Sequence, residues 1–330
     1  MKYKNAIISI LILLGAGYIY NKLKLNIETS EKIDDLDIIK RYFLNEHDDS
    51  YIDKLGTIKK PIIWIHIDYK INSRKWTSFM ERNSTQLNQS YIYLTIRSII
   101  TQCSNDFHIC LIDDNSFKKL LNNWKIDFSI LSTPHKQQIR KLAILKLIYR
   151  YGGVYIENSF IMFKTIKPIY NDAIISGKPI FGEFRSKACT NNILNMAPST
   201  ELIVSNKNNS EINKIIKELE IIISQDATNE SIILETLNRV LLNELTNNKI
   251  SCIDGRFIGT RDTNNKVIIL EDLMSNTKLE LDSNSYCLYI PRDCLEKRSS
   301  YNWFIYLSIN EVLNSNINIS KFLLISNDVN

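Results

Sequence analysis

Polar side chains that could bind a ligand or a metal ion lie at the ends of three apolar runs. The runs are IIWIHI, FHICLI and GGVYI, and the polar segments at their ends are residues 66–69, 113–114 and 157–159. Carboxylate and hydroxyl oxygens bind divalent cations, and the same groups hydrogen-bond to ribose and phosphate. The candidate site residues in these segments are His66, Asp68, Tyr69, Asp113, Asp114, Glu157 and Ser159.

Each polar segment also has a purely structural explanation. Asp113 and Asp114 precede Asn115-Ser116, and such residues are ordinary in turns and helix caps. His66 alternates with Trp64 along one strand, where a hydrogen-bonded core histidine is common. Glu157 differs in its context, because a helix, a double glycine and a strand direct it to one edge of a sheet.

The elements that must position these residues follow an alternating order. Apolar runs rich in β-branched residues predict buried strands near 62–67, 107–112 and 153–157. Between them, a stripe of Ile92, Ile96, Ile99 and Ile100 predicts one helix, and the Thr133-Pro134 start predicts another that ends at the double glycine. The order predicts an α/β fold with a mostly parallel sheet and flanking helices. Ligands of such sheets bind beyond the carboxyl ends of the strands, where the three polar segments should meet.

The second half of the chain gives fewer functional signals. Residues 211–223 and 231–245 have the pattern of amphipathic helices. Asp254-Gly255 between apolar runs predicts a β-hairpin, and residues 267–270 and 286–290 resemble further strands.

The amino terminus predicts a single membrane anchor. Residues 6–20 form an apolar run with lysines on both sides, and Tyr18 and Tyr20 are placed for the membrane interface. A cleaved signal peptide is the alternative, because Gly15-Ala16-Gly17 supplies small residues. We expect an anchor at 1–24, a polar stalk at 25–57 and a globular domain at 58–325.

Composition limits the classes of function. The net charge is +5 without a basic cluster, which argues against nucleic acid as a partner. The six cysteines form no CxxC pair, so neither a structural zinc site nor a dense disulfide framework is indicated. Frequent Ile, Asn and Lys are typical of an AT-rich genome.

The segment LAILKLIYRYGGVYIENSF resembles the central motif of the DXD-type sugar transferases, a group that includes mannosyltransferases and capsular-polysaccharide synthesis proteins. PIIWIHIDY and HICLIDDNSF are similar to the first two strands of that family, and the match spans about residues 58–170. The resemblance implies a GT-A-like fold, with a nucleotide-sugar half at 58–175 and an acceptor half at 176–325. It also implies a nucleotide sugar and a glycan or protein acceptor as partners. The chain also resembles viral proteins of this type, in which the scaffold is kept while the acidic motif varies.

The resemblance implies roles for particular residues. The positions of the two family aspartates, which bind Mn²⁺ or Mg²⁺ with the diphosphate, are Glu157 and Ser159 here, so weak metal binding is expected. Restoring the pair as Glu157→Asp with Ser159→Asp should strengthen Mn²⁺ binding. The expected nucleotide-sugar contacts are Asp113, Asp114, His66, Asp68, Gly152, Gly153 and Tyr155.

The chain departs from the family pattern in the helix before the glycines as well. Lys141 and Ile144 stand where the family tends to carry an acidic residue and an arginine. Arg140, Lys141 or Arg150 could supply positive charge at a diphosphate instead. Two functions remain open: an anchored sugar transferase, and an inactive descendant that serves as a membrane or virion component and binds a partner or glycan.

Overall fold

The computed structural model describes residues 60–67, 89–185, 196–225 and 230–327, together with Tyr42, Leu44 and Leu55. The predicted anchor, nearly all of the stalk, and Asp68 and Tyr69 lie outside these residues. Within the described ranges, no helix combines the length and the apolar character needed to cross a bilayer. The anchor therefore stays a prediction.

A six-stranded sheet lies at the centre of the described residues, in the order β2-β1-β3-β6-β5-β7. Its first three strands confirm the three predicted ones: β1 is Ile62–His66, β2 is His108–Ile112 and β3 is Gly153–Ile156. β1 pairs in parallel with both β2 and β3. Nearly all of their residues are buried, as expected for parallel strands covered on both faces.

The second half of the chain completes the same sheet. β5 (Ile180–Arg185) and β7 (Ser251–Ile253) run parallel to each other, whereas β6 (Met196–Ser205) is antiparallel to both β3 and β5. β6 is thus the only one of the six described strands that runs in the opposite direction, and the sheet is mostly parallel as predicted. Two short strands, β4 (Phe160–Met162) and β8 (Cys287–Tyr289), pair separately.

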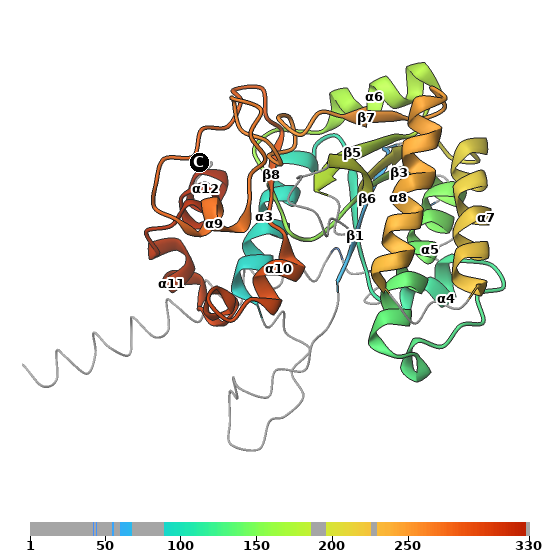
Figure 1. The fold of residues 1–330 in the computed structure, drawn as a ribbon, viewed down its shortest axis with the longest axis horizontal. Coiled ribbons are helices and arrows are strands. Elements are labelled where there is room, and N and C mark those ends of the chain that lie inside the picture. The colour runs from blue at the N-terminus through green and yellow to red at the C-terminus, as the bar shows by residue number, and fades with distance from the viewer. Residues whose placement is uncertain are drawn as a thin grey trace, which may run out of the picture. The chain divides into compact units, whose positions relative to one another are not determined.

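Helices cover both faces of the sheet (Figure 1). α5 (Thr133–Tyr151) packs against β3 and β6, α8 (Glu230–Thr246) packs against β6, and α7 (Ser210–Ser224) packs on both of these helices. α7 buries Ile212, Ile215, Ile216 and Leu219, a spacing that places them on one helical face. The predicted helices at 211–223 and 231–245 are therefore confirmed.

α3 (Ser90–Cys103) packs against β4 and against two carboxyl-terminal helices, α11 (Ile309–Asn314) and α12 (Asn318–Asn327). All four isoleucines of its predicted stripe are buried. The remaining helical segments are α4 (Ser116–Leu120), η2 (Phe128–Ile130), α6 (Lys167–Ser176), α9 (Leu270–Met274), α10 (Arg292–Lys297) and η3 (Asn302–Tyr306).

The double glycine joins α5 to β3 through a backbone that other residues adopt only under strain. The φ angles are 69° at Gly152 and 97° at Gly153. A Cβ atom on Gly153 would lie 2.2 Å from the backbone oxygen of Ile62 in β1. Gly153 is therefore needed for the close approach of β3 to β1, and a Cβ on Gly152 would instead lie 2.6 Å from the backbone nitrogen of Lys207.

The predicted hairpin at Asp254-Gly255 is wrong. The strand before it, β7, pairs in parallel with β5, and residues 254–259 continue as turns. Residues 267–270 are also not a strand, because only Val267 forms an isolated bridge and α9 begins at Leu270. The strand expected at 286–290 is present as β8.

Candidate functional site

The carboxyl ends of β1, β2 and β3 lie side by side at one edge of the sheet. His66 pairs with Ile112, and Trp64 pairs with Tyr155, so His66 stands level with the residue that follows Ile156. The register therefore brings the polar residues that follow β2 and β3 next to the end of β1. We call this edge the strand-end site.

Asp113 caps the chain turn after β2. Its Oδ1 accepts hydrogen bonds from the backbone N–H and from the hydroxyl of Ser116, both at 2.8 Å, and its side chain is buried. These contacts match the structural explanation of the Asp-Asp-Asn-Ser segment. Asp113 thus has a cap role, and its contact with a nucleotide or metal stays a prediction.

Asp114 belongs to a charged group with His66 and Arg140. The guanidinium of Arg140 donates two hydrogen bonds to the carboxylate, at 2.7 and 2.6 Å, and His66 Nε2 lies 3.0 Å from Oδ1. Burial alone would raise the pKa of Asp114, but the hydrogen bonds and charges of His66 and Arg140 hold it well below its usual value. Asp114 is therefore a carboxylate at any pH near neutral.

Glu157 lies directly after β3 and is partly exposed. Its backbone N–H donates to the backbone oxygen of Glu201 at 3.0 Å, which continues the pairing of β3 with β6. The hydroxyl of Tyr289 donates to its carboxylate at 3.3 Å. Its position at the open edge agrees with the prediction, and its approach to Asp113 or Asp114 stays a prediction.

Glu201 adds a second carboxylate from the neighbouring strand. Ile156 pairs with Leu202, so Glu157 and Glu201 are directly opposite each other, and opposite side chains lie on the same face of a sheet. The buried hydroxyl of Tyr289 has its pKa raised well above its usual value, first by burial and then by Glu157 and Glu201. Tyr289 therefore contacts Glu157 and lies within electrostatic range of Glu201.

Two cations accompany this pair of carboxylates. Lys141 Nζ, on α5, donates to the hydroxyl of Thr200 at 3.0 Å and lies 3.7 Å from the carboxylate of Glu201. Arg292, at the start of α10, donates to Glu296 at 2.8 Å. Burial alone would lower the pKa of Arg292, but the charges of Tyr91, Glu296 and Glu157 raise it, so its guanidinium lies within electrostatic range of the Glu157 carboxylate. The charges at the strand-end site are thus partly neutralised by basic side chains.

Tyr155 and the double glycine differ in their relation to this site. Tyr155 is buried two residues before Glu157, and its pKa is raised by burial and by the charges of Glu157 and Glu201. Gly152 and Gly153 lie at the amino end of β3, the opposite end from Glu157. The structure does not bring the glycines to the strand-end site, because four strand residues separate Gly152 from Glu157.

The oxygens beside Glu157 are of the kind that a hard divalent cation binds. Ser159 is fully buried, and among the described residues its hydroxyl has no hydrogen-bond partner; the same holds for Asn158 Oδ1. No group of three His, Cys, Asp or Glu side chains that could hold an ion is found in the described part of the chain. Mg²⁺ is commonly bound by one or two carboxylates together with phosphate oxygens and water, so a carboxylate and a hydroxyl are ligands of the right chemistry, and an ion at Glu157 and Ser159 stays a prediction.

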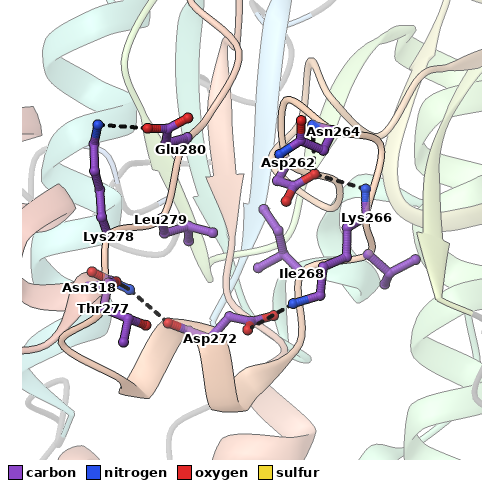
Figure 2. Close-up of a pocket in the computed structure, with 11 residues that line it drawn as sticks. Asp262, Asn264, Lys266, Ile268, Asp272, Thr277, Lys278, Leu279, Glu280 and Asn318 are labelled. Atoms are coloured by element: carbon purple, nitrogen blue, oxygen red, sulfur yellow. Dashed lines mark hydrogen bonds and ion pairs between the residues drawn. The ribbon is translucent and has the colours of Figure 1, made fainter.

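A cavity of about 260 Å³ adjoins the strand-end site and shares Glu201 and Tyr289 with it. Its apolar wall comes largely from residues 267–270. A second cavity, of about 280 Å³, is also lined by Val267 and Ile268 (Figure 2). Most of its charged side chains pair with one another, as Lys278 does with Glu280 at 2.6 Å and Lys266 with Asp272 at 3.5 Å. The first cavity is therefore the stronger candidate for a ligand.

Several residues of the site were not predicted from the sequence. Glu201, Tyr289 and Arg292 come from segments far from the double-glycine motif, and no local pattern marked them. Arg140 and Lys141 were considered as diphosphate-binding cations, and the structure places both at the strand-end site. Arg150 instead lies over the ring of Tyr151, 5.2 Å from its centroid.

No protein-family model matches the chain, and no curated protein matches it. Among solved structures, the chain is similar to the PaToxG glycosyltransferase, at 17% identity over 66% of this chain and 81% of that chain, with a TM-score of 0.34. It is also similar to the apo form of the glycosyltransferase GlyE of Streptococcus pneumoniae TIGR4, at 12% identity over 60% of this chain and 46% of that chain, with a TM-score of 0.32. A further structure of GlyE gives 14% identity over 61% and 46%, with a TM-score of 0.32. The chain thus spans less than half of the length of GlyE, and similarity at these TM-scores does not by itself establish a common fold.

Proposed function

We propose that this protein binds a nucleotide sugar at the strand-end site and transfers the sugar to a hydroxyl group of a glycan or protein acceptor. The observation that carries the proposal is the strand-end site itself. There, Glu157 and Glu201 face each other across β3 and β6, Lys141 lies beside Glu201, Arg292 lies within electrostatic range of Glu157, and a cavity adjoins the site. Its place beyond the carboxyl ends of parallel strands is where α/β sheets bind ligands. The resemblance of residues 58–170 to the DXD-type transferases supports the same GT-A-like assignment.

The basic and acidic groups would have different tasks in this reaction. Lys141 and Arg292 would stabilise the negative charge that builds on the leaving diphosphate. In the transfer, the bond between the anomeric carbon and the diphosphate oxygen breaks, and the electron pair leaves with the nucleoside diphosphate. The acceptor oxygen forms the new bond to the anomeric carbon, and its proton passes to a carboxylate such as Glu201.

A divalent cation remains part of the proposal. Mn²⁺ or Mg²⁺, held by Glu157 and Ser159, would neutralise charge on the diphosphate when bound. Weak affinity is expected, because a single carboxylate stands where the family has two. The amino-terminal anchor and a membrane location also belong to the proposal and rest on the sequence of residues 1–24.

A second function is favoured by one feature of the site. The cations Arg140 and Lys141 already lie beside carboxylates of the chain itself, Asp114 and Glu201. Because these cations are already neutralised by carboxylates of the chain, they do not require a bound anionic substrate. The protein could then be a non-catalytic membrane or virion component with the transferase architecture, which binds a partner or glycan.

Release of nucleoside diphosphate separates the two functions. We expect the full-length chain to release UDP or GDP from at least one nucleotide sugar, and Glu157→Gln to slow release at least about tenfold, on the order of 1.4 kcal/mol in the barrier. The measurement is chromatography of the nucleotide products with and without Mn²⁺. The matched control is Glu220→Gln, which changes an exposed glutamate on α7. No release from any nucleotide sugar, by wild type in either condition, would support the non-catalytic function.

A further inference from the structure

The cavity beside the strand-end site has a lining suited to one kind of ligand. The apolar side consists of residues 267–270, Phe184 and Pro291. Phe184 packs edge-on against the ring of Tyr289, with the centroids 4.8 Å apart, so an aromatic surface adjoins the residue that donates to Glu157. A ligand with an apolar or aromatic body would remove this surface from water.

The charged groups of the cavity add a second requirement. Arg185 and Arg298 line it together with a single carboxylate, that of Glu201. Arg185 is exposed at the end of β5, and among the described residues no carboxylate pairs with it. The charge of Glu201 is partly neutralised by Lys141, and Arg298 forms an ion pair with Glu271, which is not part of the lining. The lining therefore has an excess of positive charge, which favours an anionic group on the ligand.

The size of the cavity limits what can enter it. Its volume is about 260 Å³. This is below the range of about 300–1,000 Å³ for pockets that enclose a drug-sized ligand. We therefore infer that the cavity holds one end of a larger acceptor.

We propose that this cavity is the acceptor subsite and that it takes an aromatic or apolar group bearing a phosphate or a carboxylate, which Arg185 and Arg298 bind. The carboxylate of Glu201 accepts a hydrogen bond from the acceptor hydroxyl and orients it toward the strand-end site. The name acceptor subsite rests on the proposed function. The preference for an anionic apolar ligand rests on the lining alone.

Binding of small probes tests the preference without any nucleotide. We expect phenyl phosphate or benzoate to bind the full-length chain at least tenfold more tightly than phenol and inorganic phosphate, measured by ligand-observed NMR titration. Tighter binding of phenyl phosphate than of benzoate identifies phosphate as the anionic group, and the reverse order identifies carboxylate. Equal affinity for phenol and both anionic probes would overturn the proposal, as would the absence of binding by all of them.

Variants locate the binding site. Arg185→Gln with Arg298→Gln should weaken binding of the anionic probe at least tenfold, whereas Arg239→Gln, an exposed arginine on α8, should leave it unchanged. Circular dichroism and the melting temperature check that the double variant is folded. Unchanged affinity in the folded double variant, or displacement of the probe by UDP or GDP, would assign the probe to another site. If the chain binds the anionic probe but neither UDP nor GDP, the preference of the cavity for an anionic ligand stands and only the transferase function is refuted.

Discussion

Gly153→Ala is expected to lower the free energy of unfolding by more than about 4 kcal/mol, an unusually large effect for the addition of one methyl group. The new Cβ would lie 2.2 Å from the backbone oxygen of Ile62, and the residue would have to keep a φ of 97°. Since the obstructing atom belongs to the backbone of β1, no side-chain rotation relieves the clash. β1 and β3 would have to separate, and the strand-end site is built on their carboxyl ends. Chemical denaturation measures the effect.

Gly177→Ala is the matched control for this substitution. Gly177 also has a positive φ, 68°, but no atom lies within 4 Å of the position of its Cβ. The Gly177→Ala substitution should therefore lower the free energy of unfolding by only about 1–2 kcal/mol, which is the strain of a left-handed backbone. If Gly153→Ala is no more destabilising than Gly177→Ala, the close packing of β1 against β3 is not what the double glycine provides.

Ser159→Asp is expected to destabilise the metal-free protein by about 3–5 kcal/mol, because it places a carboxylate at a fully buried position. The effect is large compared with the total stability of about 5–15 kcal/mol of a typical domain. If the ion site includes position 159, Mn²⁺ should then recover much of the loss. Saturation at a hundred times the dissociation constant is worth about 2.7 kcal/mol. The measurement is the denaturation midpoint with and without Mn²⁺.

Ser159→Ala is the control for Ser159→Asp, because it removes the hydroxyl without placing a charge at the buried position. Among the described residues the hydroxyl has no hydrogen-bond partner, so its removal should change stability by less than about 1 kcal/mol. Neither wild type nor Ser159→Ala should gain as much from Mn²⁺ as Ser159→Asp. An unchanged response to Mn²⁺ in Ser159→Asp would show that Glu157 and Ser159 do not form an altered version of the acidic pair, and that the family resemblance ends at the fold.

The strands and helices that position the site could be predicted because their signals are local. The buried runs of β1, β2 and β3 are short, apolar and β-branched, and α5 is bounded by proline at its start and glycine at its end. The hairpin at Asp254-Gly255 could not be excluded in this way. Its turn residues behave as expected, since Asp254 accepts from the N–H of Arg256, but the partner of β7 lies about 70 residues earlier, in β5. Local turn chemistry does not specify a distant partner.

The position of Lys141 on α5 could have been predicted from the number of residues that separate it and Glu157 from the double glycine. Lys141 precedes Gly152 by 11 residues, about 16 Å along a helix, and Glu157 follows Gly152 by 5 residues, about 16 Å along a strand. A helix that returns antiparallel to the strand therefore places Lys141 level with Glu157. Glu201 had no comparable signal, because its position depends on β6 running antiparallel to β3. Tyr289 and Arg292 are brought in by packing across more than 130 residues of sequence.

Calorimetric titration of the full-length chain with UDP and GDP, with and without Mn²⁺, tests the central claim most directly. The account predicts that one of them binds with a stoichiometry of about one per chain and more tightly than about 1 mM. Lys141→Gln should weaken this binding at least tenfold, while Lys217→Gln, which changes an exposed lysine on α7, should not alter it. If neither nucleotide binds in either condition, or if Lys141→Gln binds as tightly as wild type, the strand-end site does not hold the diphosphate of a nucleotide sugar.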